Sequence, residues 1–289
     1  MRQGWSSAMA LAPRSGVGYQ YCPGLAFSST KAPLIKAIVS SADTANQTTA
    51  DYVLCPEVLL LLLEDGTARL LDLDGDSYAL SPTAATMLGE ALRCEVTTIA
   101  RGLAARYGID QRQAEADTLA FLNQLEQKGL IQQVSPTATT VRSTLPPRWI
   151  MTLLRLIHAW PISLSSQVTA LLTLAYCANR WSGWTGAVGA WRCYYSRQSL
   201  SPGDSSNPQI GAIDQAVRTI AARHPLKIDC KERALCAWGL ARIASQPAKL
   251  ILGVELFPMA CHCWCQLGLR IIGDDEERCV RFTPVADYD

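Results

Sequence analysis

Three residues near the end of the chain have the types that thiol chemistry requires. Cys230 opens an apolar, helix-like segment, and His262 and Asp274 follow it in that order. A thiol hydrolase needs a cysteine nucleophile, a histidine that accepts the thiol proton, and an acid that orients the histidine. The residue types and their order therefore predict a cysteine hydrolase centre.

The position of Cys230 at the start of a predicted helix favours this chemistry. The positive end of the helix dipole stabilises a thiolate, and the free amides there can stabilise an oxyanion. Cysteine is also among the most frequently buried residues, and this chain has 11 of them. A cysteine at a helix start is therefore common. Cys230 is a candidate nucleophile because His262 and Asp274 accompany it.

A strand-like alternation over residues 259–267 positions the histidine. Gly268 predicts a turn, and residues 269–272 predict a returning strand that ends just before Asp274. In such an antiparallel hairpin, His262 and Asp274 can meet. Whether Asp275 could substitute for Asp274 stays open at this point.

The cysteines around His262 also raise the possibility of a zinc site. Cys261, Cys263 and Cys265 share one face of the predicted strand, whereas His262 points to the other. Their spacing also differs from the C-x₂₋₄-C pattern of common structural zinc sites. We therefore expect no metal and no bound cofactor, and we interpret these thiols as packing residues.

Length and composition limit the classes of protein. A chain of 289 residues predicts about two domains. The net charge of +1 gives no electrostatic reason to expect binding to nucleic acid or to an anionic membrane. The most apolar stretch, 149–178, is interrupted by Arg155, His158 and Pro161, which predicts two helices and no membrane span. The absence of a secretory signal at the start and the odd number of cysteines predict reduced thiols in the cytoplasm.

Changes in composition divide the chain into four parts. Residues 1–48 lack a sustained period and predict a weakly structured extension. Residues 49–134 predict a compact domain, and the Ser-, Thr- and Pro-rich residues 135–148 predict a linker. Residues 149–289 predict a second domain that contains the three candidate catalytic residues.

The first domain has the pattern of a winged helix. Three strand-like runs, separated by Asp65-Gly66 and Asp74-Gly75 turn signals, predict a three-stranded meander. Ser81-Pro82 predicts the start of the first of three helices, and Asp110 predicts the start of the third. Both domains mix helices and strands, so we predict an α+β fold.

The stretch RLLDLDGDSYALSPTAATML, followed by helices that end in FLNQLEQKGLI, resembles the PqqD-like family of leader-peptide recognition elements. The resemblance implies that an extended leader adds to the unpaired edge of the meander, beside the third helix. A winged helix that binds DNA is the alternative, but this helix carries Glu115, Asp117 and Glu126, which phosphates would repel. The implied leader-binding residues are Asp76, Ser77, Tyr78, Ala79, Leu80, Leu122 and Leu125.

The stretches CKERALCAWGL, AKLILGV, HCWCQLGLRIIGD and RFTPV resemble the lasso peptide leader peptidases, which are transglutaminase-like, papain-like cysteine proteases. The resemblance implies that Cys230 is the nucleophile, His262 the base and Asp274 the orienting acid. Arg233 and Trp264 also match family positions, where we expect structural roles. The resemblance further implies a partner cyclase of the asparagine-synthetase-like type that uses ATP and magnesium.

Together the two resemblances predict a cysteine endopeptidase that binds the leader of a lasso peptide precursor and removes it before macrocyclisation. Two alternatives stay open. The chain could be a non-catalytic adaptor that presents the precursor, or a transglutaminase-like acyl transferase that uses the same three residues with an amine acceptor.

Overall fold

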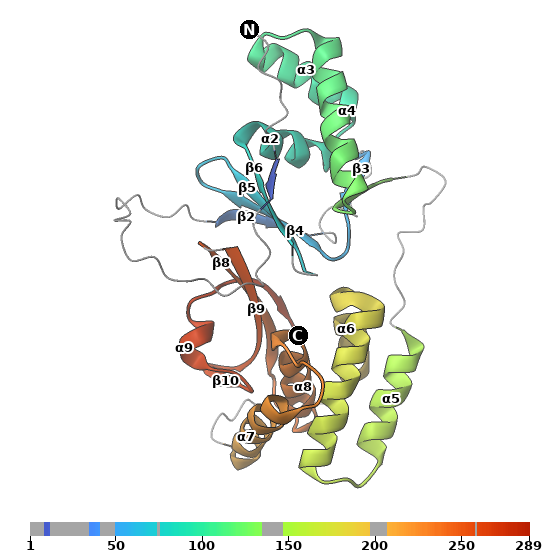
Figure 1. Cartoon of the computed structure of the whole chain (residues 1–289), viewed down its shortest axis with the longest axis vertical. Coiled ribbons are helices and arrows are strands. Elements are labelled where there is room, and N and C mark those ends of the chain that lie inside the picture. Colours follow the sequence, from blue (N-terminus) through green and yellow to red (C-terminus); the bar gives the residue numbers. More distant parts are fainter. Residues whose placement is uncertain are drawn as a thin grey trace. The chain divides into compact units, whose positions relative to one another are not determined.

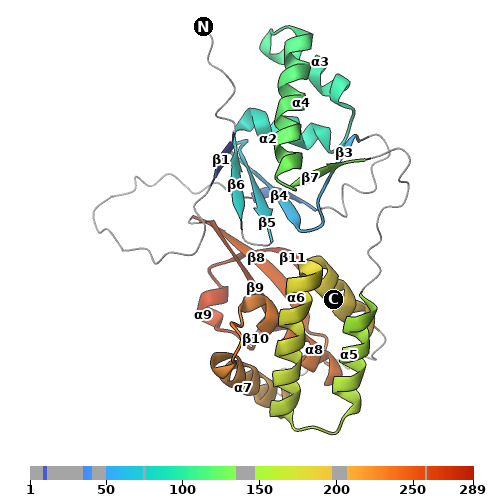
Figure 2. The same cartoon turned by 45° about the vertical axis from the view of Figure 1, so that its right-hand side comes forward.

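The computed structural model describes residues 9–11, 35–40, 50–73, 76–134, 147–196, 207–257 and 259–289. The chain divides into two compact units, Met1–Val141 and Arg142–Asp289 (Figure 1, Figure 2). This division falls inside the linker predicted at 135–148, most of which lies outside the described residues. Both units combine helices with antiparallel sheets, which confirms the predicted α+β class.

The first unit contains the predicted meander. It consists of β4 (Val58–Leu63), β5 (Ala68–Asp72) and β6 (Ser77–Leu80), which pair in antiparallel order. Asp65 Oδ1 accepts a hydrogen bond of 2.9 Å from the Thr67 amide in the first turn, where Gly66 takes a φ of 82°. The predicted turn at Asp74-Gly75 lies outside the described residues.

Two strands from the N-terminal part of the chain extend this meander to five strands, in the order β1-β6-β5-β4-β2. β1 (Met9–Leu11) pairs with β6, and β2 (Ile35–Val39) pairs with β4. Two predictions were therefore wrong. Residues 1–48 contain two strands of the sheet, and the edge of β6 is paired. The physical reason is that both edges of a three-stranded meander carry unpaired backbone groups, which a short segment can satisfy.

Three helices follow the meander, as predicted: α2 (Pro82–Ala91), α3 (Val96–Tyr107) and α4 (Gln111–Gln127). Ser81 Oγ accepts a hydrogen bond of 3.3 Å from the Ala84 amide at the start of α2. Asp110 Oδ2 accepts from two amides at the start of α4. A separate pair of antiparallel strands, β3 (Tyr52–Leu54) and β7 (Ile131–Gln133), joins the segment before the meander to the segment after α4.

Leu122 and Leu125 of α4 lie in the core of the first unit. Both side chains are fully buried, because the helical period turns these positions towards α2 and α3. The prediction that these two side chains contact a leader was therefore wrong. Among the apolar residues of α4, Leu119 is exposed at 39%.

The second unit begins with four helices: α5 (Arg148–Ala159), α6 (Leu164–Tyr195), α7 (Pro208–Arg223) and α8 (Cys230–Ile243). α5 and α6 confirm the two helices predicted for 149–178. α6 is kinked at Gly183, where φ is 67° and ψ is 176°. In the described part of the chain, every helix is too short or too polar to cross a membrane.

A four-stranded antiparallel sheet completes the second unit. Its strands are β8 (Lys249–Leu256), β9 (Met259–Leu267), β10 (Arg270–Ile272) and β11 (Thr283–Tyr288), in the order β10-β9-β8-β11. The short helix α9 (Glu276–Cys279) lies between β10 and β11. α8 packs against α6 and against β9, the strand that carries His262.

Candidate active site

Cys230 is the first residue of α8, as the sequence predicts, and its side chain is partly exposed. Asp229 occupies the cap position, and its backbone amide donates a hydrogen bond of 2.9 Å to Glu232 Oε2. The other oxygen, Glu232 Oε1, accepts a hydrogen bond of 2.7 Å from Asn179 Nδ2 of α6. These contacts fix the start of the helix and the position of the thiol, and they leave helix-terminal amides beside it.

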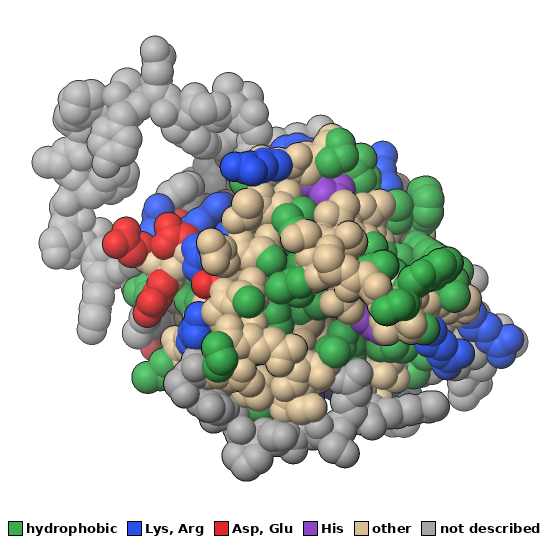
Figure 3. Space-filling model, turned by 90° about the horizontal axis from the view of Figure 1, so that it is seen from below, with side chains coloured by type: hydrophobic (Ala, Val, Ile, Leu, Met, Phe, Trp, Pro, Cys, Tyr) green, Lys and Arg blue, Asp and Glu red, His purple; other side chains and the backbone are tan. Residues whose placement is uncertain are grey.

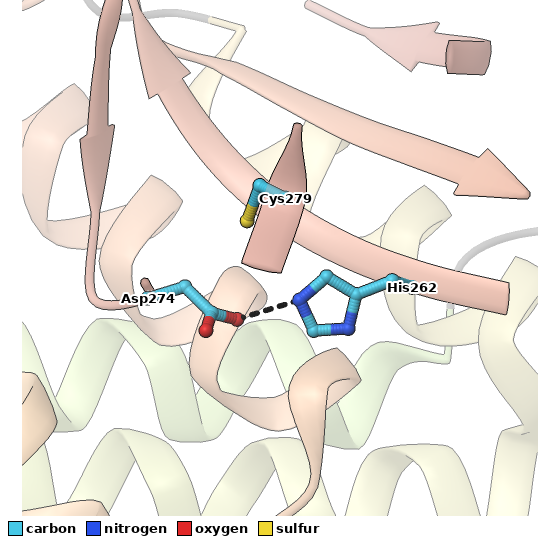
Figure 4. A group of neighbouring side chains, drawn as sticks. All are labelled: His262, Asp274 and Cys279. Atoms are coloured by element: carbon cyan, nitrogen blue, oxygen red, sulfur yellow. Dashed lines mark ion pairs between the residues drawn. The ribbon is translucent and has the colours of Figure 1, made fainter. Parts of the chain in front are cut away.

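His262 and Asp274 lie together, as the hairpin geometry predicts. His262 Nε2 is 3.0 Å from Asp274 Oδ2 (Figure 4). Both residues are almost completely buried, at 1% and 3% exposed. Gly273 precedes the aspartate with a φ of 78°, and its amide donates a hydrogen bond of 2.7 Å to Asp214 Oδ1 of α7. This contact ties the end of β10 to α7 and so places the carboxylate.

Aromatic packing restricts the histidine ring. The ring of His262 stacks on Trp264 with centroids 6.2 Å apart and lies 5.0 Å from the centroid of Phe282. Gly253 of β8 pairs with His262, and a side chain at this glycine would collide with Trp264. The imidazole is therefore held in one orientation by its neighbours, with Asp274 at one nitrogen.

The electrostatics favour an imidazolium paired with a carboxylate. Burial raises the pKa of Asp274, but hydrogen bonds from His262 and the Asp275 amide and the charge of Arg233 outweigh it, so this pKa lies below its usual value. Burial lowers the pKa of His262, but Asp274 and Cys230 outweigh it, so this pKa lies above its usual value. Cys230 contributes to this shift, which places its thiol near the imidazole.

Arg233 supports the pair from α8, one turn after Cys230. Its Nη2 atom lies 3.3 Å from Asp274 Oδ2. This position makes Arg233 a positioning residue, which refines the structural role expected for it. Asp275 is exposed, and its Oδ1 atom accepts a hydrogen bond of 3.2 Å from the Glu277 amide at the start of α9. Asp274 and not Asp275 therefore faces the histidine.

Cys279 of α9 lies beside the pair and was not singled out in the sequence. Ligand atoms of His262, Asp274 and Cys279 lie within 4.8 Å of one another, which is compatible with a metal ion (Figure 4). The Arg233 guanidinium next to the same carboxylate oxygen repels a cation, however. Burial also raises the pKa of Cys279 to about 12, which disfavours the thiolate that a metal ligand requires. The cluster therefore fits proton transfer better than metal binding.

Five of the seven predicted leader-binding residues lie on β6 or just before it, in the first unit. Asp76 precedes the strand, and Ser77 and Ala79 are partly buried, whereas Tyr78 and Leu80 are buried in the core. Lys128 Nζ at the end of α4 lies 5.2 Å from the centroid of the Tyr78 ring. The end of α4 thus lies beside β6, the strand along which the leader was predicted to add beside the third helix.

Comparison with protein families matches each unit separately. Residues 63–131 match the family of coenzyme PQQ synthesis protein D (PqqD), and residues 172–287 match the transglutaminase-like superfamily. Searches of curated proteins and of solved structures gave no match. The first match covers β6 and α4, and the second covers Cys230, His262 and Asp274. The chain therefore combines a PqqD-like recognition element with a transglutaminase-like domain, which is the organisation of a fused leader peptidase.

Proposed function

We propose that the protein is a cysteine endopeptidase that cleaves the leader from a ribosomally made lasso peptide precursor. The observation that carries this proposal is the buried His262–Asp274 pair beside Cys230 at the start of α8. This arrangement supplies the nucleophile, the base and the orienting acid of a thiol hydrolase. The preceding PqqD-like unit supports a peptide substrate that is held by its leader.

The chemistry begins when His262 takes the proton of the Cys230 thiol. The thiolate attacks the carbonyl carbon of the last leader residue, and amides at the start of α8 stabilise the resulting oxyanion. The C–N bond breaks as the imidazolium of His262 protonates the leaving amine of the core peptide. Water, deprotonated by His262, then hydrolyses the thioester and releases the leader with a free carboxylate.

Asp274 and Arg233 maintain the pair through this cycle. The carboxylate stabilises the imidazolium that forms when the thiol loses its proton, because the two groups are 3.0 Å apart in a buried site. Hydrogen bonds from His262 and the Asp275 amide lower the pKa of Asp274, and Arg233, 3.3 Å from the same oxygen, adds to this effect and helps to keep the carboxylate ionised. Proton transfer therefore stays between Cys230 and His262.

The leader docks along β6 in this proposal and replaces β1. Met9–Leu11 pairs with Tyr78–Leu80 over three residues, and Ser77 lies outside this register. A leader that pairs with the whole of β6 forms a longer ladder than β1 does, so it can displace this segment. Leu119 and Lys128 on α4 are exposed for contact with its side chains.

The proposal also includes a partner and a compartment. The new N-terminus of the core is the substrate of an asparagine-synthetase-like cyclase, which uses ATP and magnesium to close the ring. Because the precursor is made on ribosomes, we place both reactions in the cytoplasm.

Incubation of a leader-bearing precursor with the protein, followed by mass spectrometry, tests this function. We expect separate leader and core masses with the wild type and with Cys193→Ala, which removes another partly exposed thiol. Cys230→Ala should bind the precursor and leave it intact. Cleavage by Cys230→Ala would refute the assignment. Binding without cleavage by the wild type would favour the adaptor, and a mass gained by crosslinking would favour the acyl transferase.

A further inference from the structure

The outer face of α5 carries an apolar stripe. Trp149, Leu153, Leu156 and Trp160 recur at helical spacing, and the last three are 40%, 51% and 69% exposed. The opposite side of the helix packs against α6 through Ile150 and Leu154, which are fully buried. The packing of α5 on α6 therefore uses these two buried side chains, and the exposed stripe is apolar surface beyond what this packing buries.

Aromatic residues mark both ends of this stripe. Trp181 of α6 is 73% exposed, and its ring centroid lies 5.8 Å from that of Trp149 at the start of α5. Trp160 and Ile162, which is 38% exposed, lie at the other end. With a rise of about 1.5 Å for each residue, the stripe from Trp149 to Trp160 is about 16 Å long.

The charges of Lys, Arg, Asp and Glu on α5 and α6 have one sign. Between Glu126 and Asp204 the sequence has no acidic residue, although the chain as a whole has a net charge of only +1. Arg148, Arg155 and Arg180 are exposed on α5 and α6. In Figure 3, apolar side chains adjoin cationic ones on the side where α5 lies, and acidic side chains gather on the opposite side.

We propose that α5, together with Trp181 and Ile162, binds the surface of an anionic lipid bilayer. Tryptophan at both ends and leucine between them suit the boundary between headgroups and acyl chains. The arginines suit anionic headgroups. A second copy of the chain is a poorer occupant, because its own arginines would meet these arginines. This surface goes beyond leader cleavage. It rests on a local charge asymmetry that the net charge of +1, from which no binding to an anionic membrane was expected, does not reveal.

Sedimentation of the full chain with vesicles tests this surface. We expect binding to vesicles of phosphatidylcholine mixed with phosphatidylglycerol, much weaker binding to phosphatidylcholine alone, and a blue shift of tryptophan fluorescence on binding. Arg148→Gln with Arg155→Gln should weaken binding by about fivefold for each arginine removed. Leu153→Glu with Leu156→Glu should abolish it.

Two matched controls distinguish this surface from general effects of charge or exposure. Arg101→Gln with Arg106→Gln removes two exposed cations of α3, and Leu269→Glu changes a leucine that is 93% exposed at the β9–β10 turn. Both should bind as the wild type does. The arginine variants test the surface even if the glutamate variants fail to fold. No binding of the wild type to anionic vesicles at low salt, or equal losses in the controls, would overturn the proposal and assign the stripe to a protein partner.

Discussion

Replacement of Asp274 by asparagine tests how the histidine is activated. The asparagine has the same shape but removes the charge that faces His262 at 3.0 Å and Arg233 at 3.3 Å. A hydrogen bond to a charged group contributes about 1.5–3 kcal/mol. Arg233 is 22% exposed and can regain water, so we expect a net loss of about 2–3 kcal/mol in the free energy of unfolding. The rate of precursor cleavage should fall by a factor of about 10³–10⁴.

The loss of stability should depend on pH. The folded pKa of His262 is raised, so its contribution is complete below the unfolded value of about 6.5 and is lost as pH rises through the folded value. The folded pKa of Asp274 is lowered, so its contribution is present above the unfolded value of 3.8 and is lost as pH falls through the folded value. The wild type should therefore exceed Asp274→Asn in stability most between about pH 4 and 6.5.

Denaturant unfolding at several pH values and single-turnover cleavage measure these two effects. Asp275→Asn is the matched control, because it removes an exposed carboxylate one position away that caps α9. This variant should cleave normally and lose about 1 kcal/mol of stability or less. The reasoning fails if Asp274→Asn cleaves as fast as Asp275→Asn, or if its stability deficit is the same at pH 5 and pH 9.

Three further predictions concern the surroundings of the site and the leader edge. Gly253→Ala should destabilise the protein by about 1–3 kcal/mol in thermal unfolding, because its new Cβ would lie 2.7 Å from the Trp264 ring. The control Gly102→Ala places its Cβ in open space. Equal stabilities of the two variants would contradict this prediction. Deletion of residues 1–12 should tighten leader binding about tenfold in fluorescence polarisation, because β1 no longer competes with the leader for β6. An unchanged affinity would show that β1 does not compete with the leader. Cys279→Ser should retain cleavage with and without a chelator, since proton transfer requires neither that thiol nor a metal; loss of activity on chelation would favour the metal site.

Local chemistry made much of the fold predictable. The caps at Ser81 and Asp110 begin helices because their side chains accept amide hydrogen bonds there. The alternation around His262 and the turn at Gly268 place His262 and Asp274 on one hairpin, so their approach followed from the strand period and the position of the turn. Such features depend on residues that are close in sequence.

Features that depend on distant partners were missed. β1 has three residues, too few for a period, and it is a strand because β6 offers an unpaired edge. Apolar residues such as Leu122 and Leu125 are equally typical of a docking surface and of a core. The packing of α4 buries both of them in the core. Cys279 reaches the histidine through a helix of four residues, which no pattern in the sequence indicates.

Trapping of the acyl-enzyme tests the central claim most directly. Precursor mixed with a small excess of protein is quenched with acid within the first turnover, digested and examined by mass spectrometry. We expect the peptide that contains Cys230 to carry the leader as a thioester, and we expect this adduct to be absent in His262→Ala. Release of the leader by the wild type with an adduct on another residue, or with the same rate in Cys230→Ala, would contradict the proposed mechanism.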